Sequence, residues 1–346
     1  MSLFDRDESA RRCPVSVITG FLGSGKTTLL NRLLRDRAME DSLVIVNEFG
    51  AVGLDHLLME RIDGETVLMQ SGCLCCTVRT DLENTLREAA WKRREGTVPP
   101  FARVLVETTG LADPAPILHT LLGHEAIRDR YRIDTVATTV DAVNGDRQLS
   151  EHDESVKQVA IADRLLITKT DIADRLAVDA LRRRLDGINA GAPILEAVAG
   201  DVAPSWLMNG SAPQGASLDV ARWLSGTDGR QHHDVEGNHA HSRHDDGIRQ
   251  SSIETDDVIE AHRLIGWIER LLQTHGDKVL RVKGVLNMAG SDTPVVVHGV
   301  QHVFHPLTRL SRWPDDGRRS RIVIIARDLP MGPIEESFRR SVLSPR

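Results

Sequence analysis

The chain has 346 residues, which is more than one ordinary domain needs and about right for two. Hydrophobic residues make up 40% of it and charged residues 27%, the balance of a soluble globular protein. The net charge of -7 argues against general nucleic-acid binding, which needs a basic face. No apolar run approaches the roughly 18 residues of a membrane span, and the polar N-terminus lacks a signal-peptide pattern. We therefore expect a cytoplasmic protein that binds neither nucleic acid nor membrane.

The first 200 residues alternate between short apolar strands and helices. Strand candidates are rich in Val, Ile and Leu and lie at residues 15–19, 43–46, 104–106, 135–140 and 165–167. Between them, apolar residues recur with helical spacing at 26–35, 81–94 and 177–184. Nearly continuous apolar strands separated by helices predict an α/β fold with a mostly parallel sheet covered on both faces, which we place at residues 1–205.

The chain changes character in its second half. Gly, Ser, Asp and His dominate residues 206–256 and apolar periodicity fades, which predicts a flexible, His-rich linker. A helical pattern at 257–273 is followed by strand-like segments at 278–287, 293–304 and 321–326. We therefore expect a smaller α+β domain at residues 257–346.

A phosphate-binding loop joins the first strand to the first helix. The segment Gly20-Phe-Leu-Gly-Ser-Gly-Lys-Thr27 matches the pattern G-x-x-x-x-G-K-[ST] in a strand–loop–helix context. Its glycines let backbone N–H groups face a phosphate at the positive end of a helix. Lys26 can then reach the β- and γ-phosphates, and the Thr27 hydroxyl can ligate Mg²⁺. The residues expected to hold the triphosphate are Gly20, Gly23, Ser24, Gly25, Lys26, Thr27 and Thr28.

A second phosphate-sensing element follows the strand at 104–106. This strand delivers Glu107 towards Mg²⁺ and its waters, and Gly110 offers its N–H to the γ-phosphate. Asp is more usual at the acidic position, but the longer Glu can act through a water. With Lys26, these two residues are the expected catalytic groups. The alternative interpretation is a strand that ends in a charged turn.

A third motif favours guanine as the base. Thr168-Lys169-Thr170-Asp171 follows the strand at 165–167 and resembles [NT]-K-x-D. The Asp171 carboxylate can accept hydrogen bonds from the guanine N1–H and exocyclic amine, a donor pair that adenine lacks. The wrong base would leave this carboxylate unsatisfied, which gives strong discrimination. GTP is therefore favoured over ATP, although Thr168 stands where Asn is usual.

Three of the four cysteines lie within four positions, at Cys73, Cys75 and Cys76. Crowded cysteines seldom reach disulfide geometry without strain, so the cluster indicates metal binding or redox chemistry in a reducing compartment. A buried apolar turn is the alternative. Cys13 stands apart at the start of an apolar strand, where we expect a buried structural thiol.

The motifs together resemble the CobW family of metal-handling GTPases. In chain order they are the phosphate loop, N-E-F-G-x-x-G-x-D (Asn47–Asp55), G-C-L-C-C (Gly72–Cys76), E-T-T-G-L-A-D-P (Glu107–Pro114) and T-K-T-D. Leu280–Gly284 and Val297–His302 resemble the family's C-terminal domain, so the resemblance covers most of the chain. It implies a P-loop GTPase and metallochaperone that couples its nucleotide state to delivery of Zn²⁺ or Co²⁺ to a client metalloprotein.

The resemblance also assigns roles to residues. Cys73, Cys75 and Cys76 would bind the transition metal as thiolates, which suit Zn²⁺ or Co²⁺ better than Mg²⁺. Three thiolates fill at most three of four tetrahedral positions, so Glu48, a histidine, water or the client would supply the fourth. Asp55, at the end of the N-E-F-G segment, is assigned to the nucleotide site. Because the cysteines lie between nucleotide-sensing segments, GTP affinity and metal affinity should be linked.

Histidines are concentrated in the linker. His232, His233, His239, His241 and His244 lie within 13 residues, interspersed with Asp and Glu. Neutral imidazoles on a flexible chain bind Zn²⁺, Co²⁺ or Ni²⁺ loosely, so we interpret this stretch as a metal-loading or buffering segment; the alternative is a solvated linker. Three further histidines, His298, His302 and His305, lie in the C-terminal domain, and we expect His298 and His302, which lie in an apolar strand-like run, to be structural rather than ligands.

Two other functions stay open at this stage. A P-loop ATPase or kinase acting on a small molecule would need an acceptor pocket, and the sequence has no clear Arg-rich lid. A metal sensor or storage protein would turn over nucleotide only incidentally. The sequence also offers no obvious water-positioning glutamine or arginine finger. A homodimer formed on nucleotide binding, or another partner, could therefore complete the site.

Overall fold

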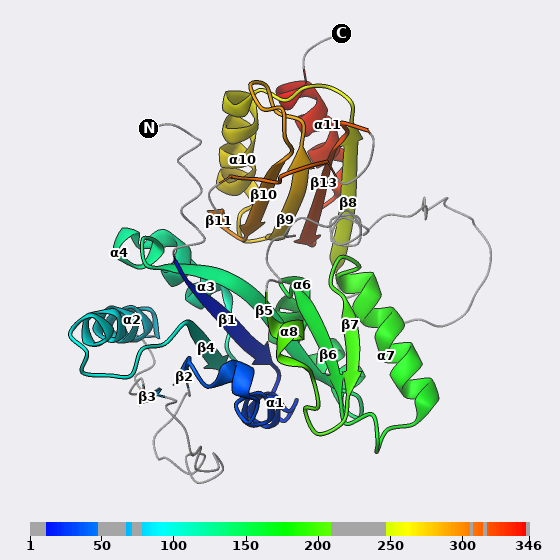
Figure 1. Cartoon of the computed structure of the whole chain (residues 1–346). Helices are drawn as coiled ribbons and strands as arrows, with labels where there is room; N and C mark the ends of the chain where they lie inside the picture. The colour runs from blue at the N-terminus through cyan, green and yellow to red at the C-terminus, as the bar shows by residue number, and fades with distance from the viewer. Residues whose placement is uncertain are drawn as a thin grey trace.

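The computed structural model describes residues 12–47, 67–70, 78–208, 247–304, 307–313 and 317–343. These residues form two sheets with their helices (Figure 1). The larger sheet has seven strands in the order β3-β2-β4-β1-β5-β6-β7, and all neighbouring strands are parallel. Its strands are β1 (Cys13–Gly20), β2 (Ser42–Asn47), β3 (Val67–Gln70), β4 (Arg103–Thr108), β5 (Tyr131–Asp141), β6 (Arg164–Thr168) and β7 (Ile194–Ala197).

Helices cover both faces of this sheet, as the sequence predicts. One face packs against α1 (Lys26–Leu33) and α8 (Pro204–Leu207), whose apolar residues share a core with residues of β1, β2, β4, β5, β6 and β7. The opposite face is covered by α2 (Val78–Arg94), α3 (Ala115–Gly123), α4 (Glu125–Arg128), α6 (Asp153–Ala160) and α7 (Arg175–Ile188). A short helix α5 (Gly145–Glu151) precedes α6, and a 3-10 turn, η2 (Arg37–Met39), follows α1. The predicted parallel α/β fold is confirmed.

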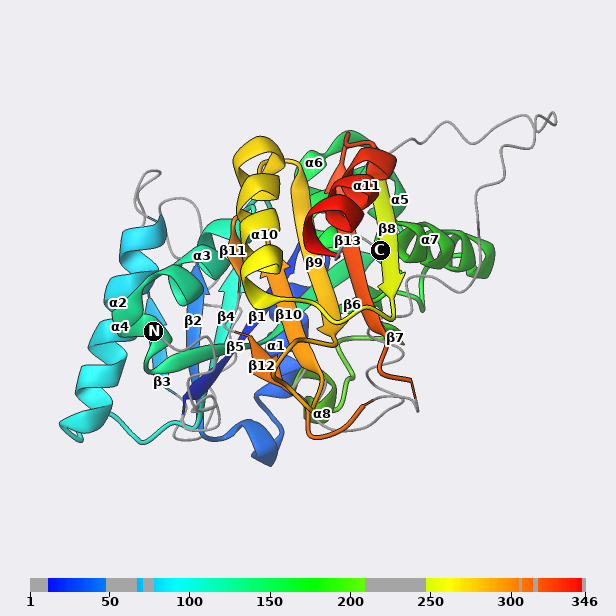
Figure 2. The same cartoon turned by 90° about the horizontal axis from the view of Figure 1, so that it is seen from above.

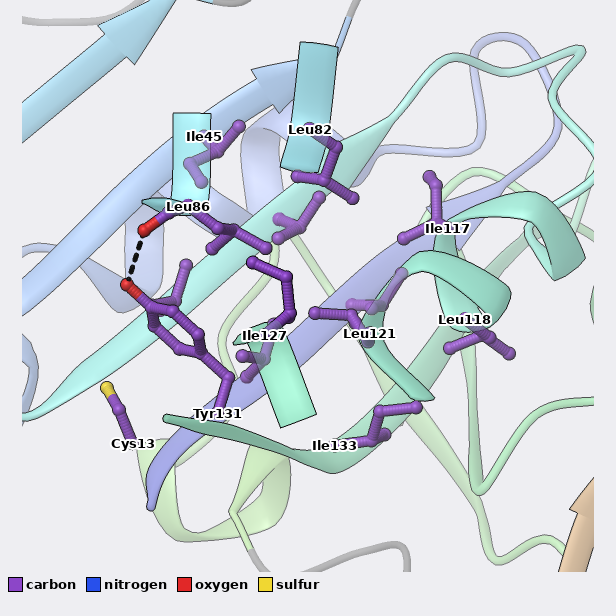
Figure 3. Packing of buried hydrophobic residues seen from close by; sticks show 14 of the residues in the cluster. Cys13, Ile45, Leu82, Leu86, Ile117, Leu118, Leu121, Ile127, Tyr131 and Ile133 are labelled. Carbon is purple, nitrogen blue, oxygen red and sulfur yellow. Dashed lines mark hydrogen bonds between the residues drawn. The ribbon is translucent and has the colours of Figure 1, made fainter. Parts of the chain in front are cut away.

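The core under α2, α3 and α4 is almost entirely aliphatic, apart from Cys13, Phe101 and Tyr131 (Figure 3). Tyr131 is only 2% exposed, and its hydroxyl donates a hydrogen bond of 2.9 Å to the Leu86 carbonyl of α2. A buried tyrosine keeps its large apolar area only if its hydroxyl finds such a partner. Cys13 lies in the same core, and burial raises the pKa of its thiol to about 11. The expected buried structural thiol is therefore confirmed.

The smaller sheet is antiparallel and has the order β11-β10-β9-β13-β8, with β12 paired to β10. Its strands are β8 (Ile248–Thr255), β9 (Val279–Leu286), β10 (Val295–Val300), β11 (Val303–Phe304), β12 (Thr308–Arg309) and β13 (Ser320–Arg327). Two helices, α10 (Ala261–His275) and α11 (Met331–Val342), cover one face. In this core the rings of Trp267 in α10 and Phe338 in α11 pack edge to face, with their centroids 5.0 Å apart.

One strand of this sheet lies where the sequence predicts a linker. β8 pairs with β13 along its whole length, from Thr255 opposite Ser320 to Ile248 opposite Arg327. Its residues are mostly polar, and only two of its eight side chains are buried, so the segment lacks a strong apolar pattern. The C-terminal domain therefore includes residues before 257. The other domain limits stay a prediction.

The second face of the smaller sheet packs on the G domain, the unit built around the larger sheet. β8, β9 and β11 contact α7, α6 and α3 respectively, and Figures 1 and 2 show this side of the sheet lying next to the G domain. Leu280 and Ile325 join the core around α6 and α7. Within that interface, Arg281 of β9 pairs with Asp163, which directly precedes β6, and both side chains are at most 1% exposed. The two domains thus share apolar and charged contacts.

Candidate functional site

The phosphate-binding loop follows β1 at the carboxyl edge of the larger sheet, where ligands of such sheets bind. Gly20, Gly23 and Gly25 all have positive φ, at 140°, 71° and 92°. A Cβ on Gly20 would lie 2.3 Å from the Thr139 carbonyl oxygen, so only glycine fits there. The loop leads directly into α1, whose N-terminus lacks any side-chain cap. The first helical N–H groups are therefore available to an anion.

Lys26 is folded into this loop. Its ammonium donates hydrogen bonds of 2.9 Å to the Gly20 carbonyl and 3.1 Å to the Phe21 carbonyl, and the residue is 8% exposed. Burial lowers the pKa of Lys26, and the Glu107 carboxylate opposes that shift. The ammonium thus lies in the loop that would surround the phosphates, as the sequence predicts.

Thr27 and Glu107 meet at the start of α1. The Thr27 hydroxyl donates a 2.6 Å hydrogen bond to Oε1 of Glu107, the next-to-last residue of β4, which is 5% exposed. Three residues further on, a Cβ on Gly110 would lie 2.6 Å from the Leu22 backbone nitrogen and 2.7 Å from its Cα. The loop after β4 therefore packs backbone to backbone on the phosphate loop. The predicted catalytic set of Lys26, Glu107 and Gly110 is brought together in space.

The Thr168–Asp171 motif lies next to the same loop. The Thr168 hydroxyl donates to the Ser24 carbonyl at 2.8 Å, while the Ser24 hydroxyl bonds the Thr139 hydroxyl at 2.7 Å. Thr168 thereby holds the end of β6 against the phosphate loop. Thr168, which stands where Asn is usual in this motif, thus has a structural role of its own.

Lys169 is held over the end of β5. It has a positive φ of 58°, and its ammonium lies 2.8 Å from Oδ2 of Asp141. Desolvation raises the pKa of Asp141, but hydrogen bonds from Asn144, Lys169 and the Val143 N–H outweigh it and hold that pKa below its ordinary value. The lysine stem is thus fixed at the carboxyl edge of the sheet. Asp171 is exposed, as a carboxylate must be to reach a base, and Thr28 is exposed in the first turn of α1.

Other predicted site residues lie outside the described ranges. They are Glu48, Asp55, Cys73, Cys75 and Cys76, together with the linker histidines and His305. Within the described ranges, no group of three or more His, Cys, Asp or Glu side chains is placed to hold a metal ion. The same part of the chain holds no helix that is long and apolar enough to cross a bilayer.

Sequence reasoning missed residues of α5, α6 and the position between them that support the phosphate loop and the loop after β4. Gln148 donates to the Leu22 carbonyl at 3.3 Å, and the His152 ring stacks on Phe21 at 4.5 Å. Gln158 donates to the carbonyls of Gly110 and Ala112. These contacts join segments more than 40 residues apart in the chain, so the sequence around each residue does not predict them. Asp141, by contrast, carries a usable signal, since it is an acidic residue at the carboxyl end of an apolar strand.

His298 and His302 take the structural roles expected of them. His298 is 5% exposed and lies 2.9 Å from Nη2 of Arg281. Since an arginine only donates, Nε2 of His298 accepts. The partly exposed His302 lies 3.2 Å from a carboxylate oxygen of Asp277.

Comparison with known proteins agrees with this geometry. Residues 14–196 match the CobW/HypB/UreG nucleotide-binding domain, and residues 248–342 match the cobalamin synthesis protein cobW C-terminal domain. The zinc chaperone YjiA of Escherichia coli is 33% identical over 324 residues, which cover 94% of this chain and 97% of YjiA. The zinc chaperone CobW of Pseudomonas aeruginosa is 29% identical over 365 residues, which cover 96% and 92% of the two chains.

A solved structure is similar over nearly the whole length. The Zn(II)-bound YjiA GTPase from E. coli superposes with a TM-score of 0.71 at 29% identity, covering 95% of this chain and 99% of that one. Both family models match in the expected order, and the two together span both sheets. The chain therefore belongs to the CobW family of P-loop GTPases.

Proposed function

We propose that this protein is a GTP-hydrolysing metallochaperone that passes zinc to a client metalloprotein under control of its nucleotide state. The observation that carries the proposal is the meeting of Lys26, Thr27, Glu107 and Gly110 around one phosphate-binding loop. Zinc is supported by the zinc chaperones that are similar over nearly the whole chain, and by the C-x-C-C sequence between the nucleotide-sensing segments.

The phosphate site binds and orients the triphosphate. The N–H groups of the loop and of the first turn of α1 surround the β-phosphate, and Lys26 exchanges its bonds to the Gly20 and Phe21 carbonyls for phosphate oxygens. The Gly110 N–H faces the γ-phosphate. Thr27 and Glu107 place a hydroxyl and a carboxylate 2.6 Å apart, hard oxygen ligands that fit Mg²⁺. Bound there, Mg²⁺ would neutralise charge on the phosphate oxygens.

Guanine is the base that the motif fits. Asp171 is exposed next to Lys169, whose stem is held by Asp141, so the carboxylate can pair with a base lying along that stem. Adenine would leave the carboxylate without donors. This argues against the ATPase or kinase alternative.

Cys73, Cys75 and Cys76 are the proposed zinc ligands, with Glu48 a candidate for the fourth position and Asp55 for a nucleotide contact. Soft thiolates hold Zn²⁺ or Co²⁺, and an exchangeable fourth position lets the metal leave. We expect the cytoplasm to be the compartment, because reducing conditions keep these thiols available. The linker histidines His232–His244 would then load or buffer metal.

Zinc titration in the two nucleotide states tests the proposal. With a competing chromophoric chelator, Zn²⁺ affinity should be higher with Mg²⁺ and a non-hydrolysable GTP analogue than with GDP. Replacing Cys73, Cys75 and Cys76 with Ser should abolish tight zinc binding. Cys13→Ala is the matched control, because that thiol is buried and keeps its proton. Equal zinc affinity in both nucleotide states would refute nucleotide control and favour a metal store.

Nucleotide-dependent dimerisation is a separate part of the proposal. Leu22 and Leu111 are 52% and 55% exposed beside the phosphate site, a place where a second copy could cover them. Light scattering with GDP and with the GTP analogue decides this. A monomer in both states would show that hydrolysis is completed within one chain or by another protein.

A further inference from the structure

We propose that Gln158 is a positioning residue for GTP hydrolysis, which fixes the loop after β4 in the geometry that senses the γ-phosphate. Its side-chain amide donates to two carbonyls of that loop, Gly110 at 3.1 Å and Ala112 at 3.0 Å. The inference rests on the proposed GTPase function and adds a residue from α6 to it.

The orientation of this amide follows from its partners. Both neighbours are carbonyl oxygens, which only accept, so the NH₂ group must face the loop. Gln158 is 1% exposed, which removes competition from water. One side chain thus holds both carbonyls that flank Leu111, whose own side chain is exposed and cannot anchor the loop.

The loop has little freedom of its own. Gly110 lies against the backbone of Leu22, so a shift of the Gly110 carbonyl also moves its peptide against the phosphate loop. Asp113, at the other end of the loop, accepts from Lys157 of α6 at 3.3 Å. Gln158 in turn is tied to the sheet, because the Thr138 hydroxyl of β5 donates to its backbone carbonyl at 2.8 Å. The amide therefore transmits the position of β5 and α6 to the γ-phosphate sensor.

A γ-phosphate-specific role makes a prediction that a merely structural role does not. In Gln158→Met, which keeps the length but removes both donors, kcat for GTP should fall by at least about tenfold. Affinity for a non-hydrolysable GTP analogue should fall as well. Affinity for GDP should stay within about twofold, because GDP lacks the phosphate that this loop contacts.

The fold offers a matched control that contacts the same helix: Asn189, the residue directly after α7. Asn189 is fully buried, and its amide donates to the carbonyls of Val159, Ala160 and Ala162 at the C-terminal end of α6. As in Gln158, its amide oxygen has no hydrogen-bond partner among the described residues. Asn189→Leu should lower the melting temperature without changing the ratio of GTP-analogue to GDP affinity.

Two results would overturn the inference. One is a folded Gln158→Met variant with wild-type kcat, and the other is an equal loss of affinity for GDP and for the GTP analogue. If Gln158→Met does not fold, Gln158→Asn decides, since it keeps a buried amide but is one methylene too short to reach both carbonyls. Wild-type protein that fails to hydrolyse GTP would instead refute the proposed function, so the two failures are distinguishable.

Discussion

The buried pair of Arg281 and Asp163 joins the two domains, and removing its arginine should destabilise the protein strongly. Both side chains lie inside the interface, at 1% and 0% exposure. Desolvation lowers the pKa of Arg281, and the carboxylate of Asp163 opposes that shift. The carboxylate also accepts from the Val136 N–H at 2.9 Å. In Arg281→Met, this backbone bond would remain but the charge would stay buried without its counterion.

The expected loss is about 3–5 kcal/mol, the cost of breaking a buried pair by deleting one partner. This loss includes the cost of leaving the Asp163 carboxylate buried and unpaired, so it is larger than the net stabilisation that the ion pair provides. The double variant Arg281→Met/Asp163→Asn removes both charges and keeps an acceptor for Val136. It should recover much of the loss, which gives a coupling energy of roughly 1–3 kcal/mol.

Urea denaturation followed by circular dichroism measures these values. Arg319→Met is the matched control, because this arginine precedes β13 and pairs with Glu254 and Asp256 at the exposed surface, where ion pairs contribute little. A loss below about 1 kcal/mol in Arg281→Met, or additive effects in the double variant, would show that the pair is solvated in solution and would refute the buried interface.

Three further predictions follow from the same geometry. Lys283 is buried, and desolvation followed by the charge of Arg281 puts its pKa well below 10.5, so the unfolded state binds its proton more tightly. The Lys283→Met variant should therefore have a higher melting temperature than the wild type at pH 7.5. The difference between the two melting temperatures should narrow as the pH rises towards 10.5, and a constant difference would refute this. Gly110→Ala drives a Cβ into the Leu22 backbone and should lower kcat by about 10²-fold, whereas unchanged turnover would show that the loop adapts. Asp171→Asn should weaken GTP binding and strengthen the binding of xanthosine triphosphate. An unaltered base preference in competition assays would refute the assignment of Asp171 as the guanine-binding residue.

Local patterns were sufficient to predict the phosphate loop and its sheet. A strand, three glycines with positive φ, and Lys26 follow one another in the chain, so their geometry depends on neighbouring residues. The parallel sheet follows from its continuous apolar strands, which need burial on both faces. The burial of Cys13 was predictable for the same reason.

Contacts between distant segments could not be predicted. The roles of Thr168 and Gln158 depend on carbonyls 144 and 48 residues away in the chain, and nothing in their own neighbourhood distinguishes them from solvent-facing polar residues. The strand β8 was missed because its side chains alternate weakly, and its identity depends on pairing with β13. Charged residues within a strand, such as Arg281 and Lys283, usually indicate a face exposed to solvent. Here both are buried, because the G domain covers that face of the sheet.

Two elements of the G domain, β6 and α6, connect the interface with the C-terminal domain to the nucleotide site. β6 begins next to Asp163, held by Arg281, and ends at Thr168, which bonds the Ser24 carbonyl. α6 begins at Asp153, which pairs with Arg327 of β13 at 2.6 Å, and carries Gln158 to the loop at Gly110. A change in how the small sheet sits on the G domain would therefore act on the phosphate loop and on the γ-phosphate sensor together. By linkage, nucleotide state would act back on the interface with the same free energy. The C-terminal domain is thus connected through β6 and α6 to both loops at the nucleotide site.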